Sequence, residues 1–427
     1  FAIPIIISNI FQQLYNTADI MIVGRFLGQD ALAAVGATAA IFELIVGFSL
    51  GVGNGMGVII ARYYGANNHR LLKRAVGATL VIGAFLSLLV AIIGSFGMYP
   101  LLQFLGTPES IIDQSYEYIS IVVIGIAVTF AYNLCAGLLR AVGNSQAALY
   151  FLIIAAILNI LLDLYFITQL HLGVQSAGIA TIIAQGISAL LCLLYIRKKV
   201  PFLLPHRKDF VWDKELYQDL LSQGLAMGLM TSIVSIGTVI LQSAINQLGT
   251  TIISAQVAAR RIMSFAVLPI TAIASSITTF ISQNFGAEQF QRIKKGVTIA
   301  NLLSWVWSVL VAALLFFTSP SLTSFISGST NPDLIANASL YLQISSCFYP
   351  ILASLIILRN ALQGMGKKLT PLTSSFIELF GKIFFVLWII PHTGYMGVIL
   401  CEPLIWIPMT LQLIIIYRKI RCQLLTE

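Results

Sequence analysis

Residues 1–28 read FAIPIIISNIFQQLYNTADIMIVGRFLG, a mostly apolar run with one acid, Asp19, inside it. A helix needs about 20 residues to cross the hydrocarbon core of a bilayer, and this run is long enough. An ionised carboxylate near the bilayer centre costs roughly 2.5–3.5 kcal/mol, so such an acid usually faces a partner, water or a transported ion. Asp19 is therefore the first candidate functional residue. Because the sequence starts within this run and not at a Met, we expect that a few residues precede Phe1 and that the run is not a cleavable signal.

The composition of the whole chain agrees with a membrane protein. Of its 427 residues, 58% are hydrophobic and only 9% are charged, whereas about a quarter of the residues of a soluble domain are charged. The net charge of +8 comes from short Lys and Arg clusters between apolar runs, which is typical of cytoplasmic loops and argues against nucleic-acid binding. The five cysteines have neither disulfide-framework nor metal-site spacing. The sequence thus predicts an all-α polytopic membrane protein.

Twelve apolar stretches are long enough to span a membrane. Their expected limits are Ile3–Leu27, Ala31–Tyr63, Leu71–Tyr99, Ile111–Ala141, Ala147–Gln169, Ala177–Ile196, Glu215–Leu248, Thr251–Phe285, Ile293–Thr318, Leu334–Gln363, Pro371–Ile390 and Tyr395–Tyr417. Alternate connections and the C-terminal tail hold 20 of the 24 Lys and Arg residues. The positive-inside rule makes that side cytoplasmic, so we expect a multi-pass protein of the inner (cytoplasmic) membrane with both termini inside. The exceptions are Arg25, Arg260, Arg261 and Lys382.

An internal repeat relates the two halves of the chain. A shift of 221 residues places 64–67 (YGAN) on 285–288 (FGAE), and a shift of 223 places 139–143 (LRAVG) on 362–366 (LQGMG). Six helices per copy is an even number, so both copies enter the membrane from the same face. The expected fold is two six-helix bundles related by a pseudo-two-fold axis along the membrane normal. We expect an N-lobe over 1–197, a cytoplasmic linker over 198–214 and a C-lobe over 215–427.

The N-terminal half carries a polar constellation that is suited to cations. Asn159 and Asp163 are four residues apart and share one helix face. If their helix meets those of Asp19 and Thr181, these four residues form an oxygen-lined pocket for a proton, Na⁺ or an organic cation. Two acids that lie close together in a low dielectric would share a proton. The four residues would be metal ligands only if the ion were Na⁺. The alternative is that each side chain merely bonds to a neighbouring group.

The C-terminal half differs at the matching positions. A shift of 219 residues places Glu378 on Asn159 and Lys382 on Asp163. A Glu and a Lys one helical turn apart can neutralise each other, which indicates a structural pair more than an ion-coupling site. Glu402 either joins this polar cluster or lines a cavity.

Enzymatic function lacks a visible site in this sequence. Gly47, Gly51 and Gly55 recur every four residues, which favours close helix packing over a dinucleotide loop. The four His residues fall at loops without metal-ligand spacing, and no P-loop, nucleophile elbow or HExxH motif occurs. We therefore expect a secondary active transporter with no cofactor.

These features together resemble the multidrug and toxic compound extrusion (MATE) family over essentially the whole chain. The residues that carry the resemblance are Pro4 with Asp19 fifteen positions later, Asn159 with Asp163, and Thr181. The resemblance implies a monomeric antiporter that exports amphipathic, often cationic compounds in exchange for H⁺ or Na⁺. It also implies that Tyr118 and Asn133 correspond to polar residues near the family's drug cavity. Gln12 and Asn16 are further candidates for that cavity.

The chain departs from one branch of the family. No acid lies between Gln223 and Gln247, and position 360 is Asn, whereas the NorM-like and eukaryotic branches have acids at the corresponding helices of the C-lobe. The chain therefore looks closer to the DinF-like or MepA-like branch, which implies that Asp19 in the N-lobe couples transport. Pro4 would be the hinge through which its protonation moves the helix.

A flippase for lipid-linked saccharides is the alternative, because related families share the double six-helix plan. Such a protein needs a strongly basic cavity for pyrophosphate. The spans offer only Lys382 and three Arg residues near the outer edge, Arg25, Arg260 and Arg261, so we prefer the exporter. The expected partners are small amphipathic substrates and the lipid bilayer, without nucleic acid.

Overall fold

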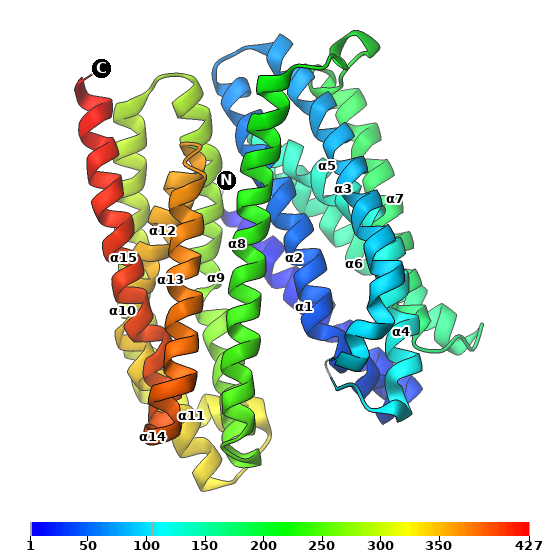
Figure 1. The fold of residues 1–427 in the computed structure, drawn as a ribbon, viewed down its shortest axis with the longest axis vertical. Helices are drawn as coiled ribbons and strands as arrows, with labels where there is room; N and C mark the ends of the chain where they lie inside the picture. Colours follow the sequence, from blue (N-terminus) through cyan, green and yellow to red (C-terminus); the bar gives the residue numbers. More distant parts are fainter. Residues whose placement is uncertain (1, 105, 427) are drawn as a thin grey trace. The chain divides into compact units, whose positions relative to one another are not determined.

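The computed structural model describes residues 2–104 and 106–426, which fold almost entirely into helices with no strand among them (Figure 1). The first half contains α1 Ala2–Leu27, α2 Gln29–Gly65, α3 His69–Phe104, α4 Glu109–Ile124, α5 Ile126–Ala141, α6 Ser145–Thr168, α7 Gln175–Lys199, and the 3₁₀ turns η1 Pro201–Leu203 and η2 Arg207–Asp209. The second half contains α8 Lys214–Asn246, α9 Thr250–Gly286, α10 Phe290–Ser327, α11 Pro332–Cys347, α12 Tyr349–Gly364, α13 Leu369–Phe384, the π-helix η3 Phe385–Ile389, α14 Ile390–Thr393 and α15 Tyr395–Thr426.

Most of these helices can cross a membrane. Within the described residues, nine are long and apolar enough, and counting each of two bent pairs as one span gives up to eleven. The first helix, α1, is not among them, although Ile3–Leu27 was expected to span. Its mean hydropathy is lowered by polar residues that include Gln12, Gln13, Asn16 and Asp19.

Two of the expected spans are broken. The stretch 111–141 divides at Gly125 into α4 and α5 with a bend of 50°, and 334–363 divides at Phe348 into α11 and α12 with a bend of 58°. A Cβ atom on Gly125 would lie 2.0 Å from Cδ1 of Ile182 in α7. The break therefore brings this backbone against α7 at a point where an added side chain would displace Ile182.

The internal repeat is visible in the helix limits. Helix α9 begins and ends 221 residues after α2, and the broken pair α11–α12 reproduces α4–α5 with a shift of 223. The turns repeat as well, since Gly28 has φ 90° before α2 and Gly249 has φ 100° before α9. Such positive φ angles favour glycine. Sequence similarity between the halves thus corresponds to equivalent helices.

The chain forms two compact units, Phe1–Thr231 and Ser232–Glu427. The first has apolar cores among α2, α3, α5 and α7 and among α1, α2, α3 and α4, and the second has one among α9, α10, α11, α12 and α15. Leu216 and Leu220 at the start of α8 belong to the first core. The boundary between the units therefore lies inside α8. The lobe limits at 197 and 215 stay predictions.

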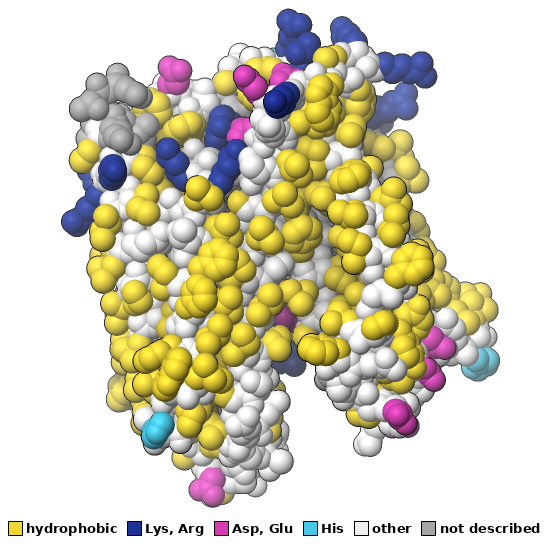
Figure 2. Space-filling model, in the orientation of Figure 1, with side chains coloured by type: hydrophobic (Ala, Val, Ile, Leu, Met, Phe, Trp, Pro, Cys, Tyr) yellow, Lys and Arg dark blue, Asp and Glu magenta, His cyan; other side chains and the backbone are white. Residues whose placement is uncertain are grey.

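Charged side chains are unevenly distributed along the helices of each unit. Lys and Arg gather toward one end, while hydrophobic side chains cover the middle (Figure 2). The span that was expected to end at Thr318 continues as α10 to Ser327. Arg359 lies in α12, inside the span that was expected over 334–363. The Arg359 side chain is only 13% exposed because it is engaged by α13.

Candidate functional site

The polar constellation of the first half is assembled by α1, α6 and α7. Helix α1 packs on α6, and α6 packs on α7. Helix α6 begins at the N-cap Asn144, whose side chain accepts a hydrogen bond from the backbone nitrogen of Ala147 at 3.1 Å. Fifteen residues after Asn144 the helix presents Asn159, and one turn further Asp163, both at most 1% exposed.

Thr181 of α7 is the centre of a hydrogen-bond cluster. It accepts from Nδ2 of Asn159 at 3.0 Å, and its own hydroxyl donates to the carbonyl of Ala177 at 2.9 Å. The hydroxyl of Tyr15 lies 3.2 Å away. Because the only hydroxyl hydrogen of Thr181 is already used, Tyr15 is the donor in that contact.

The two acids of the constellation face each other. Asp19 of α1 and Asp163 of α6 lie within hydrogen-bonding reach of each other. A hydrogen bond between two carboxyl groups requires that one of them carries a proton. Without that proton, four buried oxygens have no donor among the described residues, namely Oδ1 of Asp19, both carboxylate oxygens of Asp163 and Oδ1 of Asn159.

Two tyrosines also belong to this site, and the sequence predicted only one of them, as a residue of the drug cavity. Tyr15 was missed, although it stands one helical turn before Asp19 and therefore shares its face. Tyr118 of α4 is buried and interacts electrostatically with Tyr15 and both acids. That places a proposed cavity residue beside the acids. Asn133 of α5 is half-buried, and its part in a cavity stays a prediction.

The other candidates on α1 lie on its exposed side or in its first turn. Gln12 and Asn16 are exposed and bonded to each other, with Nε2 of Gln12 3.4 Å from Oδ1 of Asn16. Pro4 lies near the start of α1, which runs without a break from Ala2 to Leu27. The described part of α1 therefore has no break at Pro4, and the hinge stays a prediction.

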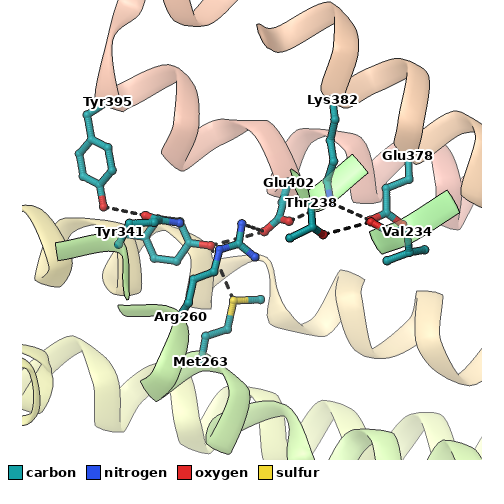
Figure 3. A network of polar contacts seen from close by, with 10 residues as sticks. Val234, Thr238, Arg260, Met263, Tyr341, Glu378, Lys382, Tyr395 and Glu402 are labelled. Atoms are coloured by element: carbon teal, nitrogen blue, oxygen red, sulfur yellow. Dashed lines mark hydrogen bonds and ion pairs between the residues drawn. The ribbon is translucent and has the colours of Figure 1, made fainter. Parts of the chain in front are cut away.

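In the second half, Glu402 joins the cluster of Glu378 and Lys382 (Figure 3). Nζ of Lys382 lies 2.9 Å from Oε1 of Glu378, one turn earlier on α13, and 3.2 Å from Oε1 of Glu402 on α15. The other oxygen of Glu402 lies 3.1 Å from the guanidinium of Arg260 on α9. Of the two alternatives for Glu402, the cluster is the one observed.

Two further residues contact the acids of this network. The guanidinium of Arg359 lies 3.8 Å from Glu378 and donates to Oγ of Ser374 at 3.0 Å. The hydroxyl of Tyr341 on α11 donates to Glu402 at 3.4 Å. Arg260, Arg359 and Tyr341 were not predicted as partners, because they are far from the acids in sequence and only helix packing brings them together.

Metal-ligand chemistry has limited support. Within the described residues, no group of three or more His, Cys, Asp or Glu side chains could hold a metal ion. The first-half site would have to combine carboxylates with amide and hydroxyl oxygens. Hard cations accept such oxygen ligands, so the donor set fits Na⁺ as well as a proton.

A known family model matches both halves of the chain. The MatE family model matches residues 4–165 and again residues 226–388. The chain belongs to the MatE family. The double match agrees with the internal repeat, because each half matches the same family model. MatE membership gives no support to the lipid-linked saccharide flippase.

Relatives and solved structures extend the MatE assignment. The chain is 28% identical over 400 residues to the probable multidrug resistance protein YoeA of Bacillus subtilis, covering 92% of this chain and 86% of that protein. It is 29% identical over 381 residues to the probable multidrug resistance protein YpnP of the same organism, covering 88% and 84%. A crystal structure of a MATE protein in the bent conformation has a TM-score of 0.90 at 23% identity, covering 100% of this chain and 95% of that one. The MATE fold is therefore shared over the whole chain.

Proposed function

We propose that this protein is an antiporter of the cytoplasmic membrane that exports amphipathic, often cationic organic compounds while H⁺ or Na⁺ moves inward. The observation that carries the proposal is a group of four buried oxygens of Asp19, Asp163 and Asn159, which find no donor in the described part of the chain unless the acids share a proton. Buried polar atoms are normally satisfied, so an unpaired group of acceptors calls for a cation. The names of the relatives YoeA and YpnP support drugs as substrates.

Charge competition is the proposed coupling mechanism. Loading the site with an inward-moving cation neutralises the acids and weakens their attraction for a cationic substrate. Unloading restores negative charge and attracts the next substrate molecule. A membrane potential supplies about 2.3 kcal/mol per charge per 100 mV, so one entering ion can drive a substantial gradient. Thr181 bonds to Asn159 on α6 and to Tyr15 on α1, and so links these two helices next to the acids.

The remaining parts of the proposal concern access and arrangement. Gln12 and Asn16 give α1 an exposed polar face for substrate, and Tyr118 adds an aromatic wall close to the acids. Asn133 would contribute from α5. Motion about Pro4 would alter access. We propose a monomer with both termini in the cytoplasm.

The decisive experiment measures ethidium transport in proteoliposomes, with pH and Na⁺ gradients imposed separately. The wild type should respond to one of the two gradients, and Asp19→Asn and Asp163→Asn should abolish that response. Asp30→Asn is the matched control, because Asp30 is an exposed acid at the start of α2. Gradient-driven transport by Asp19→Asn at the wild-type rate would refute the coupling role.

A further inference from the structure

The ionic network of the second half contains an excess of positive charge. Arg260, Lys382 and Arg359 alternate with Glu402 and Glu378, so three cations contact two carboxylates. The other described acids of this half are exposed at helix ends, Glu288 after α9 and Asp333 at the start of α11. A net positive charge in a membrane-embedded bundle is unfavourable unless an anion or water accompanies it.

The excess charge is accessible at one end of the network only. The side chain of Arg260 is 30% exposed, while those of Lys382 and Arg359 are 1% and 13% exposed. Arg260 lies ten residues into α9, about 15 Å from its start. A charge inside a span faces a cavity or the interior of the bundle instead of lipid. Arg260 is thus the group that a ligand could reach.

One unused hydrogen-bond donor lies one helical turn from this guanidinium. Gln256 stands one turn before Arg260 on the same face of α9 and is 1% exposed. Its carbonyl oxygen accepts from the hydroxyl of Tyr395 at 2.9 Å. Its amide nitrogen has no acceptor in suitable geometry among the described residues, although Tyr341 lies nearby. The surroundings of Arg260 therefore offer positive charge and an unused donor, which suits an anion.

We propose that Arg260 binds the carboxylate of an amphipathic substrate, with Gln256 as a further donor. The guanidinium is planar and matches a carboxylate through two parallel hydrogen bonds. Glu402 holds Arg260 from one side, and Lys382 fixes Glu402 in turn. This inference rests on the proposed export function and assigns Arg260 as the residue that recognises the carboxylate of substrates that carry both an amine and a carboxylate.

The test compares ciprofloxacin, which carries an amine and a carboxylate, with its ethyl ester, which lacks the carboxylate. Equilibrium binding is measured by tryptophan fluorescence on the full chain in phosphatidylcholine vesicles, with no gradient. Arg260→Gln should weaken ciprofloxacin binding about tenfold or more and leave ester binding unchanged. Arg261→Gln is the matched control, because Arg261 is the next residue on α9 and is exposed; it should leave both affinities unchanged.

Arg260→Gln leaves Glu402 bonded to Lys382 and Tyr341 and makes the network neutral, so we expect it to fold. Two further variants, at Arg260 and at Glu402, test the geometry of the site. Arg260→Lys retains the charge without the planar fork and should lose part of the preference for ciprofloxacin over its ester. Glu402→Gln releases Arg260 and should strengthen ciprofloxacin binding. Equal effects on acid and ester in these variants would overturn the proposal.

The source of the anion is distinguished by the lipid. If Arg260 served a lipid phosphate, its substitution would affect binding only in vesicles that contain phosphatidylglycerol, and that result would also overturn the proposal. Because the assay imposes no gradient, a failure of ion coupling through Asp19 would leave this measurement unaffected. The two proposals can therefore fail independently.

Discussion

At the scale of single residues, Thr181 joins the three helices of the first-half site. Its oxygen accepts from Asn159 on α6 and from Tyr15 on α1, while its hydroxyl donates within α7. A threonine can do this because its oxygen accepts two hydrogen bonds while donating one. The orientation of the Asn159 side chain therefore depends on a residue of another helix.

Thr181→Val should weaken both stability and coupling. Valine has the same shape but leaves the buried amide of Asn159 without its acceptor, which costs about 1–3 kcal/mol. We expect a lower melting temperature in detergent and slower gradient-driven ethidium transport. Thr168→Val is the control, since Thr168 bonds only to the carbonyl of Leu164 in its own helix. Equal melting temperatures for the Thr181 and Thr168 variants would contradict this role.

The sequence predicted part of the residue-level picture. The meeting of Asp19, Asn159, Asp163 and Thr181 could be anticipated from their spacing and from the resemblance to MATE proteins. The pair Glu378 and Lys382 follows from helical periodicity alone. In contrast, the ion pair of Arg260 with Glu402 joins positions 142 apart. No local pattern indicates such a contact.

At the scale of elements, the glycines of α2 allow close approach of the first part of α8. A Cβ atom on Gly55 would lie 2.5 Å from the carbonyl oxygen of Gln223, and one on Gly51 would lie 2.7 Å from that of Met227. The carbonyl of Gly47 accepts from Thr231 at 3.0 Å. The prediction that this face serves helix packing is confirmed.

Gly55→Ala should therefore destabilise the protein. The added methyl group would collide with backbone that cannot move without shifting α8, and such overpacking costs typically 1–3 kcal/mol. Gly53→Ala is the matched control, because a Cβ atom there meets nothing within 4 Å; alanine should be neutral or slightly stabilising in that helix. Thermal unfolding of both variants measures the difference. A melting temperature for Gly55→Ala at or above that of Gly53→Ala would be inconsistent with the packing.

The breaks in α4–α5 and α11–α12 show where element-level prediction stops. Apolar length predicts a span over 111–141, but it does not report a bend of 50° inside it. Glycine at position 125 permits the bend, yet position 348, where the second break falls, is Phe. Pro350, in the first turn of α12, lacks a backbone N–H and clashes with the preceding turn, so it accounts for the second break.

At the scale of the whole molecule, the repeat gives equivalent helices with different polar chemistry. The first half buries an acid pair and the second half an Arg–Glu–Lys network, and within them only Asn159 and Asp163 correspond by the repeat to Glu378 and Lys382. One architecture thus carries acidic chemistry in one unit and net positive chemistry in the other. This asymmetry is the reason for assigning ion coupling to the first unit.

The orientation predicted from the Lys and Arg distribution can be tested by cysteine labelling. With the five native cysteines replaced by Ala, Thr330→Cys between α10 and α11 should react with a membrane-impermeant maleimide in intact cells. Lys208→Cys in the linker should react only after permeabilisation. Both positions are exposed, so access to the reagent depends on the side of the membrane. The reverse pattern would place the termini outside.

The sequence by itself determined the fold class, the repeat, the helix packing of the glycines and the candidate acid pair. These follow from hydrophobic length, periodicity and spacing, which are local properties of a chain in a membrane. The tertiary structure decided the breaks inside two spans and the partners of Tyr15, Thr181 and Arg260. Such contacts join positions that are distant in the sequence. They form because helix packing buries polar and charged groups, which then have to bond to one another.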